Sequence, residues 1–156
     1  GMFLLVAPAA GNVADRIGER PLLITGLLLQ ALGAGWLALI ADPGLSYSAM
    51  ITPLVVSGIG VSLAIPAAQN AVFGSLPPDQ MGKASGANSM LRELGGVFGI
   101  AVVVAVFAGA GSYASPSAFT DGFGPAIGLS AGLALAGVLV ALTMPSRVRI
   151  LVAAVS

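Results

Sequence analysis

Ten consecutive residues, GNVADRIGER at 11–20, carry the densest group of charged side chains in this chain. Two arginines, one aspartate and one glutamate lie here, with apolar sequence on both sides. Carboxylates and guanidinium groups exchange charge-assisted hydrogen bonds, and both also stabilise the free N–H and C=O groups at helix ends. This composition is therefore suited to a turn in water between two membrane helices.

Five residues of this turn are predicted to form a cytoplasmic gating loop: Gly11, Asp15, Arg16, Gly18 and Arg20. The glycines allow positive φ angles at a tight turn. The arginines supply forked donors for carboxylates and for helix-end carbonyls. A plain anchor that keeps positive charge on one side of the membrane explains the same residues equally well.

Polar side chains within the apolar sequence are candidates to line a cavity or to couple ion movement: Gln30, Gln69, Asn70, Asn88, Arg92 and Glu93. Arg92 lies nine residues after Lys83, about 13 Å further along a helix. This distance would put Arg92 in the hydrocarbon or just at its edge. An ionisable group at that depth in the membrane is a functional hypothesis by default. The alternatives are an Arg92 side chain that snorkels to the headgroups and amides that only bond neighbouring helices.

Two local expectations follow from the positions of these residues. Arg92 and Glu93 are neighbours, so they should project about 100° apart on a helix and pair poorly with each other. Pro66 lies well inside an apolar segment, where it removes one backbone hydrogen bond and should kink the helix.

The composition indicates that lipid surrounds most of the chain. Of its 156 residues 57% are hydrophobic and only 8% are charged, with a mean hydropathy of +1.01, whereas a soluble domain has roughly 25% charged residues. Cys and His are absent, which excludes disulfides, thiolate metal sites and imidazole chemistry. No basic surplus suggests nucleic acid, and no motif supports hydrolysis or nucleotide binding. We expect no enzyme activity and no cofactor.

Hydrophobic lengths and turn residues predict an all-α, polytopic transmembrane helical bundle. Its expected parts are a partial span at 1–10, the charged loop 11–20, full spans at about 21–41, 48–73, 80–108 and 125–144, and a tail at 145–156. Residues 110–123 are expected to form a loop. The half-length of the first segment suggests a span whose beginning is missing.

The basic residues predict the orientation of these spans in a cell membrane. They fall on alternate connections: Arg16 and Arg20, then Lys83 and Arg92, then Arg147 and Arg149. The other two connections carry only Asp42 and Asp121. Because basic residues stay in the cytoplasm, the connections at 42–48 and 110–123 should face outward.

The pattern G-x-x-x-D-R-x-G-x-R between two membrane helices resembles the cytoplasmic loop signature of the major facilitator superfamily. The matching positions are Gly11, Asp15, Arg16, Gly18 and Arg20, while Glu19 stands where the signature usually has a basic residue. Downstream, the runs GIGVSLAIPAAQNAV and LPPDQMGKASGANSMLRELGGVFGIAVVVAVF are similar to the fourteen-span drug:proton antiporter branch. The resemblance covers nearly the whole chain.

The resemblance implies part of the C-terminal half of a two-half transporter with alternating access. It implies proton-coupled export of drugs or other hydrophobic small molecules, with the N-terminal half, protons, substrate and the lipid bilayer as partners, and a charge relay that involves Asp15 and Arg16. Two alternatives stay open: an uptake carrier for sugars or organic acids, and a membrane scaffold subunit without transport.

Overall fold

The structure, a computed structural model, describes residues 18–74 and 77–144, and every regular element in this part of the chain is helical. Four long helices follow one another: α2 (Glu19–Leu39), α3 (Tyr47–Phe73), α4 (Met81–Ala110) and α5 (Pro116–Thr143). A 3-10 turn, η1 (Pro78–Gln80), leads into α4. By length and composition all four helices are able to cross a membrane, which confirms the predicted all-α transmembrane class.

The helix bounds differ from expectation chiefly at α5. This helix begins at Pro116 rather than near residue 125, so the second half of the predicted loop 110–123 is helical. The Ser115 hydroxyl accepts a hydrogen bond from the Ala118 N–H at 3.2 Å, and Pro116 occupies a first-turn position where its missing N–H is not needed. The loop prediction was wrong because Ser115 and Pro116 form a helix N-terminus, although the residues around them are small and polar, as in a loop.

The other bounds lie close to the predicted ones. α2 begins inside the predicted loop 11–20, which ends with the first residues of the helix. After α2, the Asp42 side chain accepts a hydrogen bond from the Gly44 N–H at 2.8 Å, and this closes the turn as its Asp-Pro-Gly composition indicates. The predicted partial span 1–10 and tail 145–156 lie outside the described residues.

Close backbone contact joins α2 to α3 and makes glycine necessary at specific positions. A Cβ atom added to Gly33 would lie 2.5 Å from the Ser57 nitrogen and 2.6 Å from the Pro53 oxygen. One added to Gly26 would lie 2.8 Å from the Gly60 oxygen. Since helices in lipid associate through packing rather than through the hydrophobic effect, these contacts hold the pair together.

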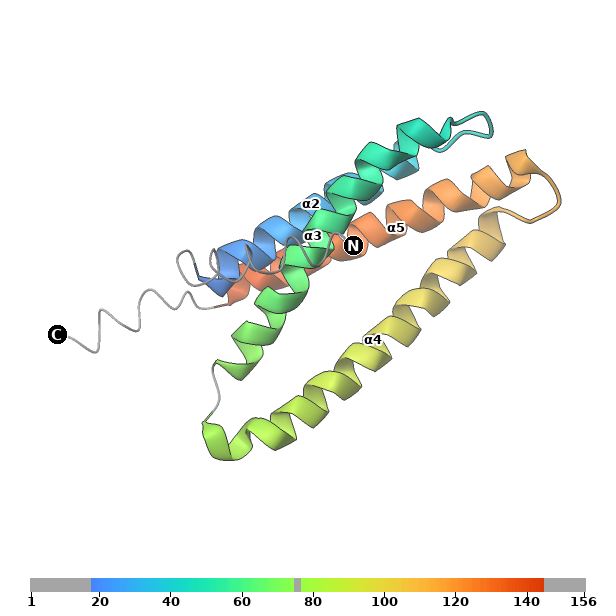
Figure 1. Ribbon diagram of the computed structural model, residues 1–156. Helices are drawn as coiled ribbons and strands as arrows, with labels where there is room; N and C mark the ends of the chain where they lie inside the picture. Colours follow the sequence, from blue (N-terminus) through green and yellow to red (C-terminus); the bar gives the residue numbers. More distant parts are fainter. Residues whose placement is uncertain (1–17, 75–76, 145–156) are drawn as a thin grey trace.

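The opposite side of α2 packs along α5 over most of its length (Figure 1). A Cβ added to Gly124 would lie 3.5 Å from the Ala38 oxygen, and one added to Gly137 would lie 3.3 Å from a methyl group of Leu27. α2 is therefore the middle member of a three-helix layer. Most buried hydrophobic residues of the described chain are alanines: Ala31, Ala64, Ala67, Ala126, Ala131, Ala134 and Ala141.

α4 stands apart from this layer (Figure 1). It approaches α5 at the outer turn, where a Cβ added to Gly111 would lie 2.5 Å from the Gly122 nitrogen. No residue of α4 is buried. Two pairs of glycines on α4 are spaced by four residues, Gly82 with Gly86 and Gly95 with Gly99, and a Cβ added to any of them would meet no atom within 4 Å in the described chain. The faces that these pairs present are open.

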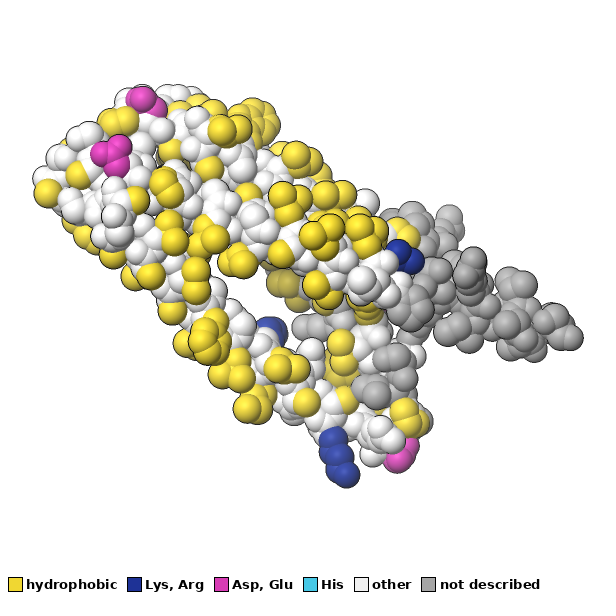
Figure 2. Space-filling model, turned by 180° about the vertical axis from the view of Figure 1, so that it is seen from behind, with side chains coloured by type: hydrophobic (Ala, Val, Ile, Leu, Met, Phe, Trp, Pro, Cys, Tyr) yellow, Lys and Arg dark blue, Asp and Glu magenta, His cyan; other side chains and the backbone are white. Residues whose placement is uncertain are grey.

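The two ends of the molecule differ in charge. The start of α2, the end of α3, the start of α4 and the end of α5 lie at one end, and the α2–α3 and α4–α5 connections lie at the other (Figure 1). Arg20 and Lys83 are at the first end, and Asp42 and Asp121 are at the second. Figure 2 shows basic side chains away from the end that carries only acidic ones. The fold thus keeps the predicted alternation of charge.

The Gly60 position tests the α2–α3 contact. Gly60→Leu should lower the free energy of unfolding by about 1–3 kcal/mol, because any side chain there meets the α2 backbone. Thermal unfolding in detergent measures the loss. Gly58→Leu is the matched control, since a Cβ at Gly58 meets nothing within 4 Å. Equal losses in the two variants would contradict this packing.

Single cysteines test the orientation, because the chain has no cysteine of its own. Asp42→Cys and Asp121→Cys should react with a membrane-impermeant maleimide added to intact cells. Lys83→Cys should react only after permeabilisation, because its end of the bundle faces the cytoplasm. Reaction of the Lys83 variant alone from outside would reverse the assignment.

Candidate functional site

The described part of the charged turn begins at Gly18, whose φ of +90° is the only positive φ among the described residues. Such an angle is strained for any residue with a side chain, so the glycine sets the direction in which the chain enters α2. Glu19 lies in the first helical turn, where the positive end of the helix dipole stabilises a negative charge. Gly11, Asp15 and Arg16 lie outside the described residues.

Arg20 reaches across the bundle to the last turn of α5. Its Nη2 donates a hydrogen bond to the Leu142 carbonyl oxygen. The sequence predicts that this arginine donates to helix-end carbonyls, and in the structure the carbonyl that accepts is that of Leu142. The start of α2 and the end of α5 lie side by side at one end of the molecule (Figure 1).

A polar and small-residue stripe runs along α4. Asn88, Arg92, Gly95 and Gly99 recur at spacings of three and four residues, which puts them on one helix face. Most residues of α4 are exposed, and six are half-buried: Ala84, Asn88, Gly99, Val103, Val106 and Phe107. The stripe is thus on the side of α4 turned toward the other helices. Figure 2 shows an open space between α4 and the rest of the molecule.

Arg92 and Glu93 make one contact with each other. Arg92 Nη2 lies 3.4 Å from Glu93 Oε1, and the two side chains are 62% and 77% exposed. A single contact of this length between exposed side chains is a weak pair, in agreement with the poor pairing expected of neighbouring positions. Such a pair contributes little when water surrounds it. Where lipid surrounds the protein, the pair gives each charge a partner of opposite sign.

The amide residues lie in three different places. The Gln30 backbone nitrogen faces Gly60 at the α2–α3 contact, so Gln30 belongs to a helix crossing. Gln69 is half-buried and Asn70 is exposed in the last turns of α3. Within residues 18–74 and 77–144 no hydrogen bond joins the side chains of Gln30, Gln69, Asn70 and Asn88 to one another. The fold does not gather these amides into one cluster.

α3 continues through Pro66 to Phe73. The Ser62 hydroxyl donates to the Gly58 carbonyl at 2.8 Å, one turn before the point where Pro66 supplies no N–H. α3 stays in contact with α2 as far as Ala67, which packs against Leu22, and the end of α3 leads toward the start of α4 (Figure 1). The kink expected at Pro66 stays a prediction.

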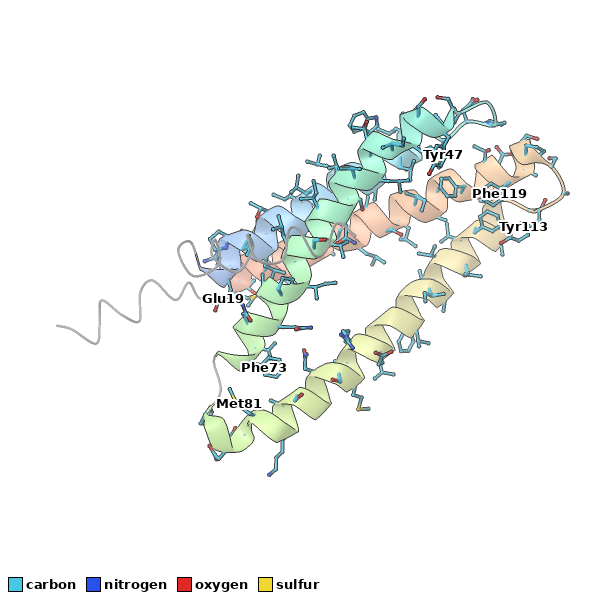
Figure 3. The ribbon with its side chains drawn as sticks, in the orientation of Figure 1. Glu19, Tyr47, Phe73, Met81, Tyr113 and Phe119 are labelled. Carbon is cyan, nitrogen blue, oxygen red and sulfur yellow. The ribbon has the colours of Figure 1, made fainter. Side chains whose placement is uncertain are left out.

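An aromatic cluster, which the sequence reasoning missed, fastens α4 to α5 at the outer end. It consists of Phe107, Tyr113, Phe119 and Phe123. Phe107 contacts both Tyr113 and Phe119, with ring centroids 5.1 and 5.3 Å apart, which is the range of favourable aromatic pairs. Figure 3 shows Tyr113 and Phe119 close together beside the turn. The spacing of Phe119 and Phe123 by one helical turn was the available signal.

Comparisons with known proteins agree with this architecture. The family model of the Major Facilitator Superfamily matches residues 1–150. The chain is 32% identical over 104 residues to the multidrug resistance protein Stp of Mycobacterium tuberculosis, which covers 67% of this chain and 19% of Stp. It is 30% identical over 110 residues to the cephamycin export protein CmcT of Amycolatopsis lactamdurans, which covers 70% of this chain and 22% of CmcT.

A further relative is the multidrug transporter protein MdtP of Bacillus subtilis, 27% identical over 106 residues that cover 67% of this chain and 19% of MdtP. The chain thus spans about a fifth of the length of the curated relatives it matches. No solved structure matches. Because the family model covers nearly all of its residues, this chain belongs to the Major Facilitator Superfamily and is part of a multi-pass integral membrane protein.

Proposed function

We propose that this chain forms the C-terminal part of a secondary transporter that exports drugs or other hydrophobic small molecules in exchange for protons. Membership of the superfamily supports transport as the activity. Relatives named for multidrug resistance and for cephamycin export support export as the direction and hydrophobic compounds as the substrates. The chain matches only about a fifth of their length, so the transporting unit includes further helices.

The open side of α4 supports a second helical bundle as the partner. α4 has no buried residue, although an isolated helix of its kind in lipid would leave Arg92 and Glu93 facing hydrocarbon, which is energetically costly. Gly95 and Gly99 leave room on the same face for another helix backbone. The N-terminal half of the transporter would lie beside α4 and help to enclose the substrate path, as alternating access requires two bundles around one site.

The observation that carries the proton-coupling part is the Arg92–Glu93 pair beside the stripe on α4. The Glu93 carboxylate lies beside Arg92 on the helix that carries the stripe, and it is the group that we propose exchanges the proton. Substrate and proton would then bind alternately on the same path.

Glu93→Gln in the full-length transporter tests this role. The amide resembles the protonated carboxyl permanently, so proton-driven export of ethidium from inside-out vesicles should fall about tenfold or more, the equivalent of ~1.4 kcal/mol or greater. Exchange of ethidium across the membrane without a proton gradient should persist, because the substrate path is intact. Both rates are measured by ethidium fluorescence.

Asp121→Asn is the matched control for this experiment. It makes the same chemical change in an exposed carboxylate at the outer end of α5, and export should stay at the level of the unaltered protein. Unchanged proton-driven export in the Glu93 variant would reject Glu93 as the coupling group. Loss of gradient-free exchange as well would indicate damage to the path instead of to coupling. Absence of any transport by the unaltered protein would reject the transporter itself and favour a scaffold.

A further inference from the structure

Three of the last carbonyl groups of α5 accept hydrogen bonds from three different kinds of donor. The final four carbonyl groups of a helix lack N–H partners within the helix, and in α5 three of them are matched individually. Thr143 Oγ1 donates to the Val140 oxygen at 2.7 Å, and the Met144 N–H donates to the Ala141 oxygen at 3.2 Å. The Leu142 oxygen accepts from Arg20.

Arg20 is therefore the charged member of this cap, and it comes from the other end of the described chain. It is separated from Leu142 by 122 positions. α5 has no basic residue in its own last turn, although the partial negative charge at a helix C-terminus favours a cation there. In the layer of α2, α3 and α5, Arg20 supplies that cation from the first turn of α2.

Packing along the two helices holds this contact in place. Gly35 faces Ala131, at 3.8 Å for an added Cβ, and Leu27 lies against Gly137. These contacts fix the position of α2 along α5 at several levels of the membrane, so the start of one helix stays beside the end of the other. Gly18, through its positive φ, aims the chain into the turn that carries Arg20.

We propose that Arg20 is a positioning residue that ties the start of α2 permanently to the end of α5. In this view the contact does not open and close with the transport cycle. It makes the start of α2 and the end of α5 one rigid unit, so a movement of α2 also moves α5. The proposal rests on the transport function for its consequence, but the contact itself is testable without transport.

Charge-matched variants measure the contribution of the cap. Arg20→Gln in the full-length protein should lower the unfolding temperature in detergent by roughly 2–4 °C, since it removes one charge-assisted helix-end contact. Lys83→Gln removes a positive charge from an exposed position at the same end, and it should change the temperature by less than about 1 °C. Arg20→Lys should lie between the two because it keeps the charge without the fork. Equal shifts for Arg20→Gln and Lys83→Gln would overturn the cap.

A reversible cross-link decides whether the contact persists through the cycle. In the double variant Arg20→Cys with Leu142→Cys, a short bifunctional methanethiosulfonate reagent should link the two cysteines efficiently. The link should restore the unfolding temperature that Arg20→Cys alone loses, and ethidium export should be the same in the linked and the unlinked double variant. The chain contributes no other thiol, because it has no native cysteine.

The outcomes separate this proposal from the function on which it rests. A link that restores stability but stops export would show that the contact must break during transport, which overturns the permanent tie. Failure to link in native membranes would overturn the contact. A protein that exports nothing in any form, yet links and regains stability as described, would reject the proposed function and leave the cap intact.

Discussion

Direct backbone contact between α2 and α3 is the constraint on which the rest of this structure depends. In lipid the removal of apolar surface from water provides no force between helices, so close packing has to provide it. Gly26, Gly33 and Gly60 allow carbonyl and N–H groups of the two helices to approach within a few ångströms of each other's Cα atoms. Pro53 is fully buried at the same contact, where its carbonyl oxygen faces Gly33.

This contact determines the place of every other helix. Once one side of α2 is filled by α3, only the opposite side is left for α5, and small residues line that side as well. The resulting layer brings the start of α2 beside the end of α5, where Arg20 finds the Leu142 carbonyl. α4 has no position in the layer and is held at its outer end by aromatic rings and by the Gly111–Gly122 contact.

The open α4 and the capped α5 indicate two different uses of charge in one membrane protein. Arg20 donates a hydrogen bond to the end of α5 within the layer, so its charge stabilises the packing of two helices. Arg92 and Glu93 are paired with each other on a helix whose faces have no cover among the described residues. The first arrangement is complete within the described residues, whereas in the function that we propose another bundle would cover the second.

Much of the fold was predictable because its causes are local. Apolar length alone predicts four spans, and the alternation of basic residues predicts which ends lie together. The turn at Asp42 follows from its own side chain. The start of α5 was missed although its signal is local too: Ser115 and Pro116 form an N-terminal cap within a stretch whose small polar residues resemble a loop.

The sequence by itself determined the solvent, the helical class, the number of described spans and the family signature, since hydropathy, charge and motif spacing are properties of neighbouring residues. Only the tertiary structure decided which glycines are needed. Gly60 meets α2 whereas Gly99, in an equally small-residue pattern, meets nothing in the described chain. It also decided that Arg20 binds an oxygen 122 positions away and that Arg92 turns to Glu93. These outcomes depend on which helix faces lie against each other, and the spacing of residues along one helix does not specify that.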